Sequence, residues 1–136
     1  IRVANVTSQL KASKARQILV IADSCHSGTL LRGVEPLKVL PPHDNWIKKV
    51  VSRKSRRALT SGTYLEPVLD GGGQGHSVFT GYLIDLLRDN GSVLGANKLY
   101  DDLKRLVVAN SDQIPQYGTL HKAGDEGGEF MFVSEP

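Results

Sequence analysis

A run of five aliphatic residues at positions 18–22 (ILVIA) constrains the fold of this chain more than any other stretch. The run has the length of a β-strand and shows no alternation of apolar and polar residues. Such a run is typical of a central parallel strand that is covered on both faces of a sheet. We therefore expect residues 18–22 to form an inner strand whose carboxyl end carries Asp23, Ser24 and Cys25.

The spacing of apolar residues elsewhere predicts helices that flank this sheet. The clearest set follows Ser77, a candidate helix cap, and comprises Val78, Phe79, Tyr82, Leu83, Leu86 and Leu87. This order of helices and strands, without an internal repeat, is typical of an α/β fold. The other expected elements are helices at residues 7–16, at residues 46–51 and after the candidate cap Asn97, and strands at residues 57–61 and 129–133.

Composition indicates one globular domain. The chain has 136 residues, of which 40% are hydrophobic and 23% charged, which is enough to bury a core. The net charge is only +3, and six of the 17 basic residues lie in the segment 48–57. The charge is therefore local, whereas a nucleic-acid-binding protein usually spreads its basic residues over a wider surface.

Other features of the composition bear on the cellular compartment. The chain contains one cysteine, so it cannot form an internal disulfide, and a reducing compartment such as the cytoplasm is expected. No apolar stretch approaches the roughly 20 residues that span a bilayer, and no signal-peptide core is visible. The glycine-rich residues 70–75 lack the Gly-Lys-Ser/Thr ending of a phosphate-binding loop and predict a flexible connector, with a substrate-side loop as the alternative.

Cys25 is the main candidate for chemistry. Reactive groups collect at the carboxyl ends of parallel strands, and Cys25 falls there. A nucleophilic thiol needs a base or a positive environment, together with N–H donors for an oxyanion. The alternative is a buried cysteine that packs as a small apolar residue. A cysteine phosphatase is disfavoured, because Leu31 occupies the place of the phosphate-binding arginine and Arg32 comes one residue late.

The stretch ILVIADSCHSG resembles the cysteine motif of caspase-like peptidases, especially metacaspases and their bacterial relatives. Three further stretches resemble the same family in the same order: residues 58–62 (ALTSG), 75–80 (GHSVFT) and 127–132 (GGEFMF). The resemblance implies a caspase-like sheet of mostly parallel strands flanked by helices. It also implies that residues 1–136 form a single partial domain, which begins shortly before the cysteine strand.

The same resemblance implies a cysteine endopeptidase. Cys25 would attack a peptide carbonyl to form an acyl-enzyme, and its own backbone N–H would contribute to the oxyanion hole. Asp23 would lie in the primary specificity pocket and pair with an Arg or Lys before the scissile bond. Ser61 is the second residue with an implied substrate-binding role. The alternative for Asp23 is a strand-end acid that is bonded to nearby backbone N–H groups.

A catalytic histidine cannot be assigned within this sequence. In caspases it lies about 50 residues before the cysteine, whereas no histidine precedes Cys25 and the His-Gly motif of the family is absent. We expect a separate segment, outside this chain, to supply the histidine, as in zymogens that are cut into associated pieces. Ile1 as first residue fits this expectation, but it is equally compatible with an arbitrary boundary. A catalytic role is not expected for the four histidines present, His26, His43, His76 and His121, and the one alternative is a different fold that brings His76 near Cys25.

No cofactor or metal ligand is assigned. Calcium is implied by the resemblance to metacaspases alone, because Glu66, Asp70, Asp125 and Glu126 do not have the spacing of a calcium loop. The expected partners are a protein or peptide substrate with a basic residue before the cut, and the histidine-bearing segment. Residues 48–57 offer bonds for self-processing, or else form a solvated basic face. Two other functions remain open: an inactive caspase-like binding or regulatory module, and nucleic-acid binding through the basic segment.

Overall fold

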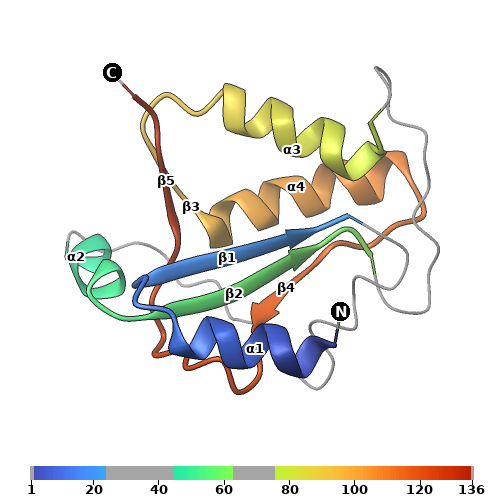
Figure 1. The fold of residues 1–136 in the computed structure, drawn as a ribbon. Helices are drawn as coiled ribbons and strands as arrows, with labels where there is room; N and C mark the ends of the chain where they lie inside the picture. The colour runs from blue at the N-terminus through green and yellow to red at the C-terminus, as the bar shows by residue number, and fades with distance from the viewer. Residues whose placement is uncertain (1, 24–44, 63–75, 136) are drawn as a thin grey trace.

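The computed structural model describes residues 2–23, 45–62 and 76–135 (Figure 1). Its helices are α1 (Val3–Ala12), α2 (Trp46–Val51), α3 (Val78–Arg88) and α4 (Ala96–Asn110). Its strands are β1 (Gln17–Ala22), β2 (Ser55–Thr60), β3 (Val93–Gly95), β4 (Gln116–Thr119) and β5 (Met131–Val133). The predicted α/β class is confirmed, and the aliphatic run at residues 18–22 is β1.

The main sheet has the strand order β1-β2-β4, so β1 is an outer strand among the described residues, which differs from the inner strand that its aliphatic sequence predicts. β1 and β2 are parallel, with Ala22 opposite Thr60, and β4 runs antiparallel to β2, with Gln116 also opposite Thr60. The ends of β1 and β2 and the start of β4 therefore meet at one edge of the sheet, together with the start of α3 (Figure 1, right). We call this the carboxyl edge. A second sheet pairs β3 with β5 in antiparallel fashion.

Helices cover both faces of the main sheet (Figure 1). α3 and α4 pack on one face, and a buried core lies between these helices and the sheet: Leu59, Phe79, Leu83, Ala96, Leu99, Leu103, Val107 and Tyr117. α1 packs on the other face, where Ala58, Leu120 and Ala123 are buried against the half-buried Leu10 and Val20. β2 is buried along its whole length, whereas β1 is only half-buried and Ile21 is 40% exposed.

Arg56 in β2 docks α1 onto the sheet, although its side chain is 0% exposed. The guanidinium donates hydrogen bonds of 2.8–3.3 Å to backbone carbonyls, four of which belong to the end of α1 and the turn that leads to β1: Leu10, Ser13, Ala15 and Arg16. The last carbonyls of a helix lack partners within the helix and carry partial negative charge, so a cation is favourable there. This arrangement compensates for the burial of the charge.

The neighbouring Arg57 is also buried. Its Nε lies 3.0 Å from Oδ1 of Asp125, and one of its terminal nitrogens donates to the carbonyl of Gly128 at 2.9 Å. The basic segment 48–57 therefore does not form one continuous basic surface, because two of its six basic side chains point into the protein. This is a correction to the expectation of a solvated basic face or of self-processing along the whole segment.

Some element boundaries differ from the predicted ones. The first helix covers Val3–Ala12 rather than residues 7–16. Gly95, not Asn97, is the N-cap of α4, so the prediction for Asn97 is wrong; its backbone N–H instead donates to Glu129 within the first turn. Strands β3 and β4 were not predicted. Within the described ranges, no helix has the length and apolar character needed to cross a membrane.

Candidate active site at the carboxyl edge

The carboxyl edge brings together two of the three predicted site residues. Asp23 directly follows β1, and Ser61 directly follows β2. Cys25, the predicted nucleophile and oxyanion donor, lies outside the described residues, as do His26 and His43. Cys25 is two residues after Asp23 in the sequence. Asp23 therefore marks the point at the end of β1 from which the chain continues to the cysteine.

Asp23 is bound to the first turn of α3. The hydroxyl groups of Ser77 and Thr80 both donate hydrogen bonds to Oδ2 of Asp23. The hydroxyl oxygen of Ser77 also accepts a hydrogen bond from the backbone N–H of Thr80 at 3.0 Å, so Ser77 is the N-cap of α3 as predicted. A carboxylate is electrostatically favourable at this end of a helix. In the described structure, Asp23 is thus bonded to side-chain hydroxyls of α3, a helix more than 50 residues away in the sequence, and not to backbone N–H groups near the strand.

Among the described residues, one oxygen of the Asp23 carboxylate has no partner. Asp23 is exposed, and Oδ1 makes no hydrogen bond to any described residue. No Lys or Arg side chain within the described ranges pairs with it either. An ionised carboxylate has room for several donors on its two oxygens. Within the described ranges, Oδ1 of Asp23 therefore keeps unused acceptor capacity while Oδ2 contacts α3.

Ser61 is held against β1 and is fully buried. Its backbone N–H donates to the carbonyl of Ala22 at 3.1 Å, which extends the pairing of β1 and β2 by one step. Its hydroxyl has no hydrogen-bond partner in the described structure. Buried polar groups normally find a partner, so an unpaired hydroxyl here retains a hydrogen bond that a bound group can make.

Gln113 is a polar residue at the same edge that the sequence did not indicate. It lies in the short connection between α4 and β4 and is 1% exposed. Neither the oxygen nor the nitrogen of its side-chain amide has a hydrogen-bond partner among the described residues. In the sequence, Gln113 is a polar residue two positions before Pro115, and no pattern around it predicts burial.

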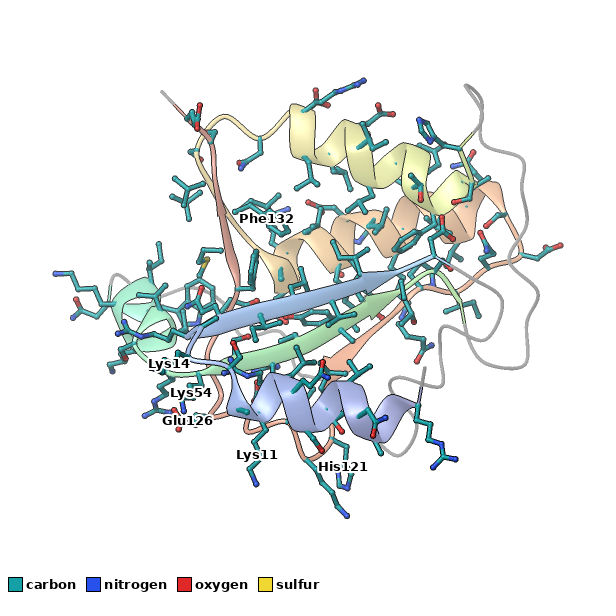
Figure 2. All side chains as sticks on the ribbon, viewed as in Figure 1. Lys11, Lys14, Lys54, His121, Glu126 and Phe132 are labelled. Atoms are coloured by element: carbon teal, nitrogen blue, oxygen red, sulfur yellow. The ribbon has the colours of Figure 1, made fainter. Side chains whose placement is uncertain are left out.

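The two described histidines lie at different places. His76 is exposed and precedes Ser77, which places it at the carboxyl edge next to a residue that contacts Asp23. His121 lies two residues beyond β4, which runs away from this edge because Thr119 pairs with Arg57. Figure 2 shows His121 below α1, on the same side as Lys11. His121 is therefore not part of the carboxyl edge.

A second buried polar cluster lies at the start of α4, away from this edge. Glu129 is 2% exposed, and its Oε1 accepts hydrogen bonds from the hydroxyl of Tyr117 at 3.1 Å and from the backbone N–H of Asn97 at 3.2 Å. Burial raises the pKa of Glu129, although these hydrogen bonds and Arg57 oppose the shift. Burial and the charge of Glu129 also raise the pKa of Tyr117. This cluster stabilises the fold; its position does not suggest catalysis.

The acidic residues that were considered as calcium ligands have other partners or lie outside the described residues. Asp125 accepts hydrogen bonds from the backbone N–H of Arg56 at 2.7 Å and from the side chain of Arg57, and Glu126 accepts one from the backbone N–H of Lys54. Glu66 and Asp70 are not described. In the part of the chain that the structure describes, no three His, Cys, Asp or Glu side chains are grouped as metal ligands.

Comparison with known proteins gives one match. A family model for the caspase domain matches residues 1–123, which include β1, the cysteine motif, β2, α3, α4 and β4. No curated protein and no solved structure matches the chain significantly.

Proposed function

Because the chain belongs to the caspase-domain family, whose members are cysteine peptidases acting on protein substrates, we propose that it is the cysteine-bearing part of a peptidase that cleaves after Arg or Lys. The observation that supports this specificity is Asp23, an exposed carboxylate that is held at the carboxyl edge two residues before Cys25. A pocket that selected acidic residues would instead need cationic groups at this place.

The proposed reaction proceeds through an acyl-enzyme on Cys25. The thiolate attacks the carbonyl carbon of the scissile bond, and the backbone N–H of Cys25 stabilises the negative charge on the carbonyl oxygen. A histidine donates a proton to the leaving amine as the C–N bond breaks, which leaves a thioester. The histidine then removes a proton from water as the water oxygen attacks the thioester carbon, and the C–S bond breaks to release the carboxylic acid and regenerate the thiolate beside a protonated histidine.

Substrate selection is assigned to Asp23 and Ser61. The guanidinium of an arginine, or the ammonium of a lysine, would pair with Oδ1 of Asp23. Charge-assisted hydrogen bonds of this kind are about twice as strong as neutral ones. Ser61 would supply a neutral hydrogen bond from its unpaired hydroxyl. The two residues directly follow adjacent paired strands. Because Ser61 is fully buried, its hydrogen bond requires a substrate side chain that reaches below the surface.

The catalytic histidine is proposed to come from a segment outside this chain, with residues 1–136 as a single partial domain. The family's His-Gly motif is absent from the sequence. The exposure of β1 also supports this proposal, because its aliphatic sequence is typical of an inner strand while Ile21 is 40% exposed. A further strand beside β1 would cover this surface in the assembled peptidase.

Regulation by self-processing is proposed for the exposed basic residues that precede β2: Lys48, Lys49, Arg53 and Lys54. Bonds after Arg56 and Arg57 are excluded as sites in the folded protein, because both residues are buried in β2. Such a zymogen would be cytoplasmic, since its reactive thiol needs a reducing environment.

Covalent labelling of the full-length protein tests the proposed function. The probe is an acyloxymethyl ketone that ends in arginine, and the adduct is located by intact mass and peptide mapping. We expect one adduct, on Cys25, and none in the Cys25→Ala variant. Absence of labelling under conditions that activate the protein would favour an inactive binding module instead.

The source of the histidine is tested with the same probe. His76→Asn and His121→Asn form a matched pair, because both histidines are exposed but only His76 lies at the carboxyl edge. We expect both variants to label at the rate of the parent protein. Loss of labelling in His76→Asn alone would place the base within this chain and overturn the proposal of an external histidine.

A further inference from the structure

The geometry around Asp23 points to two further residues that determine specificity. We propose that Ser77 and Thr80 are positioning residues, which hold the Asp23 carboxylate so that Oδ1 faces the basic side chain of the substrate. This inference rests on the proposed role of Asp23 in the specificity pocket. It assigns a function to the first turn of α3, which the cysteine motif does not include and to which the family match gives no role.

The direction of the hydrogen bonds follows from the chemistry of the groups. An ionised carboxylate can only accept, so the hydroxyls of Ser77 and Thr80 must both donate to Asp23. Each hydroxyl has a single proton, and both protons are directed to the same oxygen, Oδ2. Two donors on one oxygen fix the rotation of the carboxylate and leave Oδ1 for the ligand.

The first turn of α3 is a rigid support for these hydroxyls. Phe79, between Ser77 and Thr80, is fully buried in the core, and Leu83 one turn later is buried as well. Ser77 itself is buried, and its hydroxyl oxygen is further fixed by the backbone N–H of Thr80. Asp23 is exposed and lies at the end of a strand, so without these bonds its side chain would sample several rotamers. Preorganisation of a binding group lowers the entropic cost of binding.

The two hydroxyls can be removed with different consequences for the helix. Ser77 is both a donor to Asp23 and the cap of α3, so Ser77→Ala removes both functions. Ser77→Asn keeps a good capping residue and offers an N–H donor. Thr80 contributes only its backbone N–H to the cap. Thr80→Val therefore deletes the hydroxyl while it keeps the shape of the side chain, and Thr80→Ser retains the hydroxyl donor as the matched control.

Binding of matched peptides tests the proposal without turnover. The full-length protein carries Cys25→Ala, and calorimetry measures its affinity for two peptide amides that differ only in the last residue, arginine or citrulline. Citrulline has the shape of arginine but no charge, so the ratio of the two affinities reports the contribution of the ion pair. Thermal unfolding of every variant verifies that α3 stays folded.

We expect the parent to bind the arginine peptide at least about tenfold more tightly than the citrulline peptide, and Asp23→Asn to abolish this preference. Thr80→Val and Ser77→Ala should reduce the preference about threefold or more by weakening arginine binding, while citrulline binding stays the same. Thr80→Ser and Ser77→Asn should retain most of it.

The contrary outcomes separate the two levels of the proposal. If Asp23→Asn abolishes the preference but Thr80→Val and Ser77→Ala retain it, the hydroxyls only tie β1 to α3 and the positioning role is wrong, while the proposed specificity stands. If Asp23→Asn retains the preference, or if neither peptide binds, the pocket at Asp23 is refuted and the positioning role with it.

Discussion

The hydroxyl of Tyr117 donates a hydrogen bond to the carboxylate of Glu129, with 3.1 Å between the two oxygens, where both side chains are buried. Tyr117 belongs to β4, and Glu129 also accepts from the backbone N–H of Asn97 in the first turn of α4. This one carboxylate therefore connects the main sheet, α4 and the chain segment that leads to β5.

Tyr117→Phe tests the strength of this connection. The substitution removes a hydrogen bond to a buried carboxyl group, so we expect the free energy of unfolding to fall by about 1–3 kcal/mol in urea titrations. Tyr82→Phe is the matched control, because the hydroxyl of Tyr82 makes no hydrogen bond to the described residues, and a change within about 0.5 kcal/mol is expected. Equal effects of the two substitutions would show that the bond does not contribute to stability.

The raised pKa of Glu129 predicts a dependence of stability on pH. Burial raises this pKa above its ordinary value of 4.5, so the folded protein holds the proton more tightly than the unfolded chain does. The resulting stabilisation is complete below 4.5 and is lost as the pH rises through the raised value.

Glu129→Gln should therefore remove part of the pH dependence. We expect the stability of the parent, relative to Glu129→Gln, to decrease as the pH rises from about 4 to about 8 in urea titrations. Glutamine keeps an oxygen that accepts from Tyr117 and Asn97, so the variant should fold. Parallel pH profiles for the two proteins would mean that Glu129 does not titrate differently in the folded and unfolded states.

Arg56→Met should detach α1 from the sheet. Methionine fills part of the buried space but leaves the carbonyls of Ser13 and Ala15, in the turn after α1, without the Arg56 donor, and we expect a loss of about 3 kcal/mol or more in unfolding free energy. Hydrogen exchange should increase first in α1. Arg53→Met, at an exposed position, should change stability by no more than about 0.5 kcal/mol. Unchanged exchange in α1 would contradict the docking role of Arg56.

Two glycines should respond in opposite directions to alanine. A Cβ at Gly128 would lie 2.2 Å from the backbone oxygen of Arg53, so the backbone must shift, and Gly128→Ala should destabilise the protein by about 1–3 kcal/mol. A Cβ at Gly81 in α3 would meet no described atom within 4 Å apart from its chain neighbours and the backbone of its own helix, and Gly81→Ala should stabilise by up to about 1 kcal/mol. Thermal unfolding of both variants checks the prediction, and a stable Gly128→Ala protein would contradict the close approach.

Local patterns in the sequence predicted the elements that carry most of the apolar spacing. The aliphatic run predicted β1, and the stripe after Ser77 predicted α3 together with its cap, because each depends on neighbouring residues alone. β4 was missed because its four residues, QYGT, include one large apolar side chain and a glycine. β3 and β5 are only three residues each, and β5 lies within the strand predicted at residues 129–133, where residues 127–132 also resemble the final strand of the family.

The contacts that define the candidate site depend on residues that are distant in the sequence. The motif indicated Asp23, and helical spacing indicated Ser77, but no local pattern pairs them across 54 positions. The same limit applies to Arg56, which the sequence groups with an exposed basic segment. The acceptors that allow its burial are backbone carbonyls of α1 and the following turn, about 40 residues or more away in the sequence. The geometry at Cys25 remains a prediction, since that residue lies outside the described ranges.

The most direct test of cleavage after basic residues is the hydrolysis of matched fluorogenic peptides by the activated full-length protein. The peptides differ only in the residue before the cleaved bond, which is arginine, lysine, citrulline or aspartate. We predict that kcat/KM is high for arginine and lysine and at least about tenfold lower for citrulline and aspartate, and that Cys25→Ala abolishes hydrolysis of all four. Preferred cleavage after aspartate or citrulline, or hydrolysis that persists in Cys25→Ala, would contradict a basic-specific peptidase that acts through Cys25 and Asp23.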